Sequence, residues 1–131
     1  MNNILKKICE DKKLEIEILK NKCSLNSLKK LLSDKIIKRD FQSNIVNSSI
    51  EKRNFIIGEI KKSSPSAGEI INSYEPVEIA KIYERAGVKA ISILTEKNYF
   101  KGDIDHLSFI KQNTNIPVLR KHLIYNPISA G

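Results

Sequence analysis

Over most of its length the chain alternates short apolar runs with stretches of helical periodicity, and this alternation restricts the fold more than any other feature. The apolar runs are residues 55–60, 90–94 and 116–120. Between them, residues 75–86 and 103–110 carry apolar side chains at helical spacing. Strands that are apolar on both faces and joined by helices are typical of a parallel sheet with right-handed crossovers. The sequence therefore predicts an α/β fold built from βαβ units.

The N-terminal part of the chain has a different pattern. Residues 3–20 place apolar side chains at helical spacing with charges between them, which predicts an amphipathic helix. A second short helix is expected near Leu25–Leu32, and residues 33–53 are expected to form a connector with a short helical turn. We therefore divide the chain into an N-terminal helical extension, residues 1–53, and a strand-and-helix region, residues 54–131.

Composition excludes several classes of protein. Hydrophobic residues make up 40% of the 131 residues, which is enough for a core. No apolar run approaches the length of about 18 residues that a membrane span needs. Met1–Lys7 leads into a mixed, charged segment and not into the apolar stretch of a secretory signal. A cytoplasmic protein without a membrane partner is the expectation.

The net charge of +8 comes from 23 basic and 15 acidic residues. Basic and acidic side chains are interspersed along the chain, and the few aromatic residues do not interleave with a basic stripe. This pattern favours a local site for small anions over a nucleic-acid surface. The two cysteines and two histidines are isolated in the sequence, so no metal site is predicted.

Charged side chains stand at the ends of the first and third predicted strands. Glu59 and Lys61 share one face of the first strand because strand side chains alternate, and Lys121 ends the third. Ligands of α/β folds bind at the carboxyl ends of parallel strands, so these three groups are expected to meet there. Two ammonium groups and a carboxylate can bind an anion while one lysine donates a proton. The alternative is that they are ordinary solvated charges.

Residues 58–68, with the sequence Gly-Glu-Ile-Lys-Lys-Ser-Ser-Pro-Ser-Ala-Gly, closely resemble the first-strand motif of the indole-3-glycerol-phosphate synthase family. Three further segments match that family in the same order: residues 74–87, 92–102 and 116–121. The resemblance covers roughly residues 54–128, and the helical N-terminal extension fits the family too.

The resemblance implies a (β/α)₈ barrel with additional N-terminal helices, of which this chain would hold about three βα units. It implies the reaction that makes the indole precursor of tryptophan. In that reaction a carboxyphenylamino-deoxyribulose phosphate closes a ring and loses carbon dioxide and water, without a metal or organic cofactor. The implied partner is therefore an anionic, phosphorylated small-molecule substrate.

The resemblance also implies roles for individual residues. Lys121 matches the general acid at the ketone oxygen, Lys61 matches the lysine that holds the substrate carboxylate, and Glu59 matches the glutamate that orients this pair. Two further positions match substrate contacts of the family, Ser64 and Pro65. Two others match the apolar wall around the anthranilate ring, Leu94 and Phe100.

Two features depart from the family pattern. After Lys121 the family usually has aspartate and an aromatic residue, whereas this chain has His122 and Leu123. We expect looser packing of the substrate ring and a change in how Lys121 is held. A barrel of this type also needs about 200–250 residues, whereas the sequence has 131.

Strands four to eight therefore have no counterpart in this sequence. The phosphate-binding loops after strands seven and eight are missing with them, as are the family's later catalytic glutamate and asparagine. We expect a truncated chain that is inactive alone. Because open sheet edges pair with other strands, we also expect it to self-associate or to pair with a chain that supplies the missing strands.

Two other hypotheses remain open. The chain could be a non-catalytic half-barrel module for binding or interaction, or another phosphate-binding barrel enzyme such as an isomerase of the same pathway. The presence of Glu59, Lys61 and Lys121 argues against the first, since a scaffold does not need them. The Lys-x-x-Ser-Pro-Ser motif that begins at Lys61 argues against the second.

Overall fold

The computed structural model describes residues 3–31 and 39–122. These residues fall into two compact units. One holds residues 39–121 and the other holds residues 3–31 with His122. No helix in these described ranges is both long enough and apolar enough to cross a membrane. The division of the chain after residue 53 stays a prediction.

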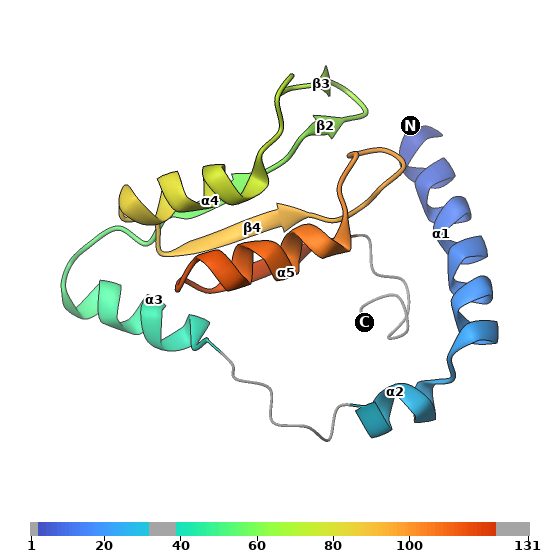
Figure 1. Cartoon of the computed structure of the whole chain (residues 1–131), viewed down its shortest axis with the longest axis horizontal. Helices are drawn as coiled ribbons and strands as arrows, with labels where there is room; N and C mark the ends of the chain where they lie inside the picture. The colour runs from blue at the N-terminus through green and yellow to red at the C-terminus, as the bar shows by residue number, and fades with distance from the viewer. Residues whose placement is uncertain (1–2, 32–38, 123–131) are drawn as a thin grey trace. The chain divides into compact units, whose positions relative to one another are not determined.

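The two helices expected near the N-terminus are present (Figure 1), as α1 (Asn3–Lys22) and α2 (Leu25–Leu31). In α1 the buried side chains are Ile8, Lys12 and Ile16, four residues apart, so they form one stripe of the helix. The helix forms as predicted, but its buried stripe includes a lysine, and four of its apolar side chains are at least 40% exposed: Leu5, Leu14, Ile18 and Leu19. Leu32, the expected end of α2, lies outside the described residues.

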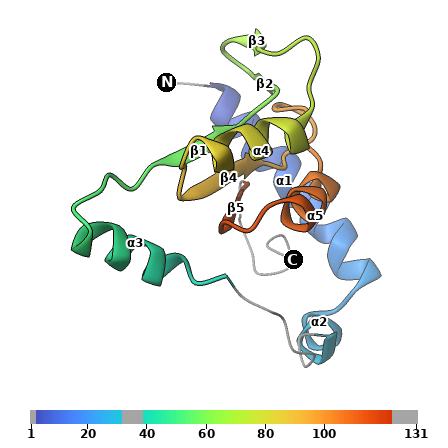
Figure 2. The ribbon, with the colours of Figure 1, turned by 60° about the vertical axis from the view of Figure 1, so that its left-hand side comes forward.

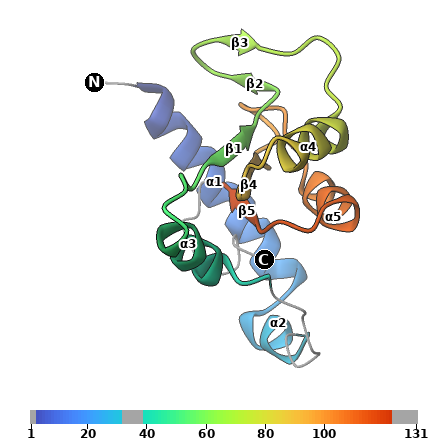
Figure 3. The same ribbon diagram turned by 90° about the vertical axis from the view of Figure 1, so that its left-hand side faces the viewer.

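The other unit contains a three-stranded parallel sheet with the strand order β1-β4-β5. Helix α4 connects β1 to β4 and helix α5 connects β4 to β5, and Figure 3 shows both helices on the same side of the sheet. The bounds are Ile57–Ile60 for β1, Pro76–Arg85 for α4, Ala90–Leu94 for β4, Ile104–Asn113 for α5 and Val118–Lys121 for β5. The predicted α/β class is confirmed, and the arrangement is that of part of a (β/α)₈ barrel.

Local signals explain where these helices begin and end. Pro76 opens α4, where its missing N–H breaks no helical hydrogen bond. Gly87, with φ +87°, turns the chain after α4 in a conformation that favours glycine. The side chain of Asp103 accepts a hydrogen bond from the backbone N–H of Asp105 at 3.0 Å and so caps α5.

A third helix, α3 (Phe41–Ile50), stands where only a connector with a short helical turn was expected. Its ten residues make it longer than that prediction. The Asp40 side chain caps it by accepting a hydrogen bond from the Ser43 N–H at 2.9 Å. The Phe41 ring also meets the Phe55 ring edge to face at 5.4 Å between centroids. These two interactions stabilise a helix that apolar periodicity alone did not indicate.

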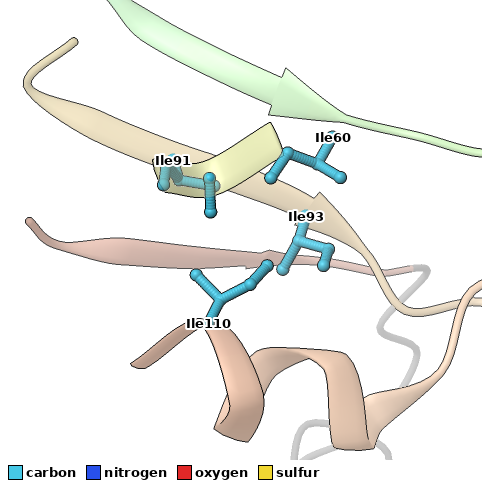
Figure 4. Close-up of a cluster of buried hydrophobic side chains, with 5 residues drawn as sticks. Ile60, Ile91, Ile93 and Ile110 are labelled. Atoms are coloured by element: carbon cyan, nitrogen blue, oxygen red, sulfur yellow. The ribbon is translucent and has the colours of Figure 1, made fainter. Parts of the chain in front are cut away.

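The core lies between the sheet and helices α4 and α5 (Figure 4). Ile60 and Ile93 stand side by side in the β1–β4 register, and both are almost fully buried. Ile91 and Ile110 complete the apolar contact between strand and helix together with Ala80. Burying each isoleucine stabilises the fold by roughly 1.5–3 kcal/mol relative to an exposed side chain. The core therefore fixes the ends of the strands that carry the site.

Beyond the end of β1 the chain forms a small antiparallel ribbon of β2 (Ser63–Ser64) and β3 (Gly68–Glu69). Figure 2 shows this ribbon projecting away from the sheet. Gly68 turns it with φ +67°. The Ser-Pro-Ser segment of the sequence motif is thus a tight turn.

Candidate active site

The register of the sheet determines which side chains share a face. Ile60 points to the helices, so Ile57 and Glu59 point to the opposite face of β1. On that face Glu59 aligns with Ser92 of β4, and Leu94 aligns with Lys121 of β5 one row nearer the carboxyl ends. The predicted charged residues thus lie on one face and at one end of the sheet.

Glu59 and Lys121 come from strands that are not neighbours, because β4 lies between β1 and β5. Two strand spacings amount to about 9–10 Å. Glutamate and lysine side chains are long enough to span that gap together. Lys121 Nζ lies 2.6 Å from Glu59 Oε2, within hydrogen-bond distance.

The carboxylate of Glu59 joins both lysines. Lys61 Nζ lies 3.1 Å from Oε1 of Glu59, so each carboxylate oxygen takes one ammonium group. The side chains of Glu59 and Lys61 are about one-third exposed, and that of Lys121 is more than half exposed. The structure therefore brings the three predicted residues together and leaves them accessible to a ligand.

This contact sets the charge of the site. The hydrogen bond from Lys121 lowers the pKa of Glu59 below its ordinary value of 4.5, and Lys61 acts in the same direction, while partial burial opposes them. Glu59 is consequently ionised at neutral pH, and the cluster keeps one positive charge in excess. Each ammonium group also carries more N–H donors than its bond to Glu59 uses. Such a cluster can bind an anion and deliver a proton.

Two residues that the sequence reasoning did not assign support β1 at this point. The hydroxyl of Tyr83, from α4, donates a hydrogen bond to the backbone carbonyl of Glu59 at 3.0 Å. The Tyr83 ring lies against Gly58 so closely that an added Cβ would stand 2.6 Å from a ring carbon. A glycine inside a strand is a signal of such an approach, and Gly58 is that signal here.

Ser64 and Pro65 lie on the β2–β3 ribbon. The Ser64 hydroxyl accepts a hydrogen bond from the Ala67 N–H at 3.1 Å, so it stabilises the turn, and Pro65 is exposed. In the part of the chain that the structure describes, no hydrogen bond joins either residue to the charged cluster. Their role as substrate contacts stays a prediction.

Leu94 and Phe100 flank the end of β4. Leu94 is the last residue of that strand, and only 4% of it is exposed, so little of its surface is open to a ligand. Phe100 is half-buried in the loop that follows, where its backbone N–H donates a hydrogen bond to Glu96 at 3.2 Å. Glu96 is a further residue to which the sequence assigned no role. Its only signal was its place just after a strand end.

His122 and Leu123 were expected to change how Lys121 is held and how the substrate ring packs, and the structure describes only the first of these two residues. His122 Nε2 lies 2.9 Å from Lys12 Nζ, and both residues belong to the unit that holds α1. Lys121 takes the carboxylate of Glu59 as its partner. Leu123, and with it the expected loosening of ring packing, lies outside the described residues.

Comparison with known proteins gives consistent matches. The family model described as "Indole-3-glycerol phosphate synthase" matches residues 5–129. A protein of that name from Campylobacter fetus subsp. fetus is 40% identical over 123 residues, which cover 92% of this chain and 46% of that protein. The protein of that name from Clostridium acetobutylicum is 43% identical over 123 residues, which cover 92% of this chain and 45% of that protein. The protein of that name from Priestia megaterium is 41% identical over 125 residues, which cover 95% of this chain and 45% of that protein. The chain thus spans about half the length of these curated relatives.

Proposed function

This chain belongs to the indole-3-glycerol phosphate synthase family, and we propose that it supplies the first three barrel strands of an enzyme that makes indole-3-glycerol phosphate for tryptophan biosynthesis. The substrate would be 1-(2-carboxyphenylamino)-1-deoxyribulose 5-phosphate. The observation that carries this proposal is the convergence of Lys61 and Lys121 on the carboxylate of Glu59 at the carboxyl ends of two strands. A substrate with a carboxylate and a ketone needs an anion-binding group and a proton donor side by side.

In this proposal Lys121 is the general acid. The ring carbon that carries the carboxylate attacks the ketone carbon, and the carbonyl electrons move to the ketone oxygen, which takes a proton from the Lys121 ammonium group. Loss of carbon dioxide restores the aromatic ring. The new hydroxyl then takes a second proton and leaves as water, while the neighbouring methylene carbon loses a proton and the double bond of the indole ring forms. Lys121 suits this task because its side chain is more than half exposed and is aimed by its hydrogen bond to Glu59.

Lys61 would bind the substrate carboxylate before it leaves as carbon dioxide, and it can share the proton transfer. Glu59 holds the two ammonium groups on its two oxygens, which fixes where the ketone and the carboxylate must lie. Ser64 and Pro65 would contact the substrate from the β2–β3 ribbon. Leu94 and Phe100 would form the apolar wall for the anthranilate ring, with most of the contact from Phe100 because Leu94 is only 4% exposed.

We also propose that these 131 residues need further strands for turnover. β1 and β5 are the outer strands of the described sheet, so each offers an edge to another strand. Ile57 and Leu119, on the face that α4 and α5 do not cover, are 46% and 41% exposed. A chain that supplies the remaining barrel strands would pair with these edges and cover this face, and self-association is the alternative. A cytoplasmic location stays a prediction.

The test is complementation. Residues 1–131 are mixed with, or fused to, the remaining barrel segment of the Clostridium acetobutylicum relative, and product formation from the ribulose phosphate substrate is followed. We expect turnover by the combined protein, none by either part alone, and loss of turnover with Lys121→Met. Turnover by residues 1–131 alone would contradict the need for further strands. A folded fusion protein without turnover would contradict the enzymatic proposal and favour a non-catalytic half-barrel module.

A further inference from the structure

The loop between β4 and α5 is organised around a buried carboxylate. Glu96 is 2% exposed. Its Oε1 accepts a hydrogen bond from the backbone N–H of Asn98 at 3.1 Å, and its Oε2 accepts bonds from Tyr99 at 2.6 Å and Phe100 at 3.2 Å. A buried charge is tolerated only where hydrogen bonds compensate it, and bonds to a charged acceptor are stronger than neutral ones. The carboxylate therefore fixes three successive backbone groups.

The same loop is closed by its backbone. The Gly102 N–H donates a hydrogen bond to the Glu96 carbonyl at 2.8 Å. An added Cβ at Gly102 would stand 2.2 Å from the Leu94 carbonyl oxygen, so the chain returns to the end of β4 as closely as glycine permits. Lys101, with φ +51°, makes the left-handed turn that brings it there. The Gly102–Glu96 hydrogen bond thus closes the 96–102 loop, and Gly102 lies against the end of β4.

This loop starts at the centre of the candidate active site. β4 is the middle strand, with Glu59 on one neighbouring strand and Lys121 on the other. Phe100 lies in the loop that the Gly102–Glu96 hydrogen bond closes, and its N–H is one of the three that donate to the Glu96 carboxylate. The position of the Phe100 backbone is therefore determined by a residue that itself is not available to a ligand.

We propose that Glu96 is a positioning residue, whose buried carboxylate holds Phe100 in place to pack against the ring of an aryl carboxylate ligand. The choice of ligand rests on the proposed function, whereas the loop geometry does not. A catalytic role for Glu96 is disfavoured, because both of its oxygens accept backbone hydrogen bonds and the residue is almost completely buried. Glu96 acts on the ligand only through Phe100.

The loop is tested by amide hydrogen exchange, measured by NMR on the 131-residue chain. In Glu96→Ala the Tyr99 and Phe100 amides are expected to exchange at least about tenfold faster, as for the loss of hydrogen bonds to a charged group. Glu96→Gln is expected to lie between this variant and the native chain, since its one carbonyl oxygen can keep the two bonds of Oε2. It also serves as the test if Glu96→Ala does not fold. Unchanged exchange at Tyr99 and Phe100 would overturn the proposal.

Glu84 provides a matched control. Its carboxylate also accepts backbone hydrogen bonds, from Asn115 at 2.6 Å and Ile116 at 3.4 Å, but outside this loop. Glu84→Ala is expected to speed exchange at Asn115 and to leave Tyr99 unchanged. Faster exchange of Tyr99 in this variant would mean that loop protection reports general stability, which would contradict a specific role for Glu96.

The ligand is tested with 2-aminobenzoate as the probe. Glu96→Ala and Phe100→Ala are each expected to weaken its binding by about threefold to tenfold, the size of an aromatic packing contact. The double variant is expected to bind within about twofold of Phe100→Ala alone. If the double variant binds 2-aminobenzoate clearly more weakly than Phe100→Ala alone, Glu96 does not act on the ligand through Phe100, and the proposal is wrong. If the native chain does not bind the probe, the aromatic wall of the proposed function is wrong, while the exchange experiment still decides whether Glu96 positions the loop.

Discussion

Lys121 Nζ lies 2.6 Å from Glu59 Oε2, although β4 separates the two strands that carry these residues. The contact joins the outer strands of the sheet at their carboxyl ends. Lys61 Nζ meets the other oxygen of the same carboxylate at 3.1 Å. One acidic group therefore sets the spacing of two cations, and this spacing determines which anions the site can accept.

The carboxyl group of Glu59 should titrate below its ordinary pKa of 4.5, because Lys121 and then Lys61 stabilise its charged form. A folded-state pKa below the unfolded value means that ionised Glu59 stabilises the fold above about pH 4.5, and that this contribution disappears as the pH falls through the folded-state pKa. NMR titration of the Glu59 carboxyl carbon measures the midpoint. Lys121→Met is expected to raise this pKa more than Lys61→Met, because the Lys121 hydrogen bond is its largest cause.

Lys111→Met is the control for that titration, because Lys111 is an exposed lysine on α5, away from the carboxylate. It should leave the midpoint unchanged. Equal shifts in the Lys61 and Lys121 variants, or a larger shift for Lys61, would contradict the order of the two contacts.

Much of this arrangement follows from sequence rules. Ala90–Leu94 was predicted to the residue, because an apolar run between a helix-ending glycine and a polar loop leaves little freedom in its bounds. The meeting of Glu59 and Lys121 was also expected, since parallel strands bring their carboxyl ends to one edge. The first prediction depends on a pattern within one strand, and the second on a general rule for parallel strands.

The features that were missed depend on contacts between distant residues or on loop backbone. α3 was underestimated because its stability includes the Phe41–Phe55 ring contact, which no periodicity encodes. Glu96 had no assigned role because its function arises from the path of the loop, which brings three N–H groups around one carboxylate. Tyr83 was recognised only as an apolar position of its helix, whereas its hydroxyl reaches the Glu59 backbone.

Removal of the carboxylate should strengthen the binding of small anions. Glu59→Gln leaves the Lys61 and Lys121 ammonium groups without the charge that now lies 3.1 and 2.6 Å from them. Benzoate is expected to bind about threefold to tenfold more tightly, with a steeper dependence on salt. Titration calorimetry at two ionic strengths measures both effects. Turnover by the combined enzyme is expected to fall, because the lysines lose the group that orients them.

Glu69→Gln is the control for this experiment, since Glu69 pairs with Lys62 and Lys101 at 3.8 Å and contacts neither lysine of the cluster. Benzoate affinity should not change in it. Weaker binding of benzoate by Glu59→Gln would contradict this prediction. It would mean that the Glu59 carboxylate mainly holds the two lysines in the geometry that binds the anion, and that its competition with the anion is minor.

Substitutions in the core between the sheet and its helices should destabilise the fold far more than substitutions on the opposite face of the sheet. Ile93 is fully buried among the core isoleucines, and Ile93→Ala is expected to lower the free energy of unfolding by about 2–5 kcal/mol through lost contacts and a cavity. Ile57→Ala, in the neighbouring strand at 46% exposure, is the matched control and should cost less than about 1 kcal/mol. Urea denaturation of both variants measures the difference. Equal losses would mean that the face with Ile57 is also packed as a core.

The close approach of Tyr83 to Gly58 should make this glycine difficult to replace. A Cβ at Gly58 would stand 2.6 Å from a ring carbon, so Gly58→Ala is expected to reduce the free energy of unfolding by about 1–3 kcal/mol. Gly87→Ala separates steric crowding from backbone strain: apart from its chain neighbours, no residue comes within 4 Å of its added Cβ, and its φ of +87° alone should cost about 1 kcal/mol. In a Tyr83→Ala background the added cost of Gly58→Ala should largely vanish, because the ring that it meets is gone. If the cost persists in that background, the strand backbone and not the ring excludes a side chain at Gly58.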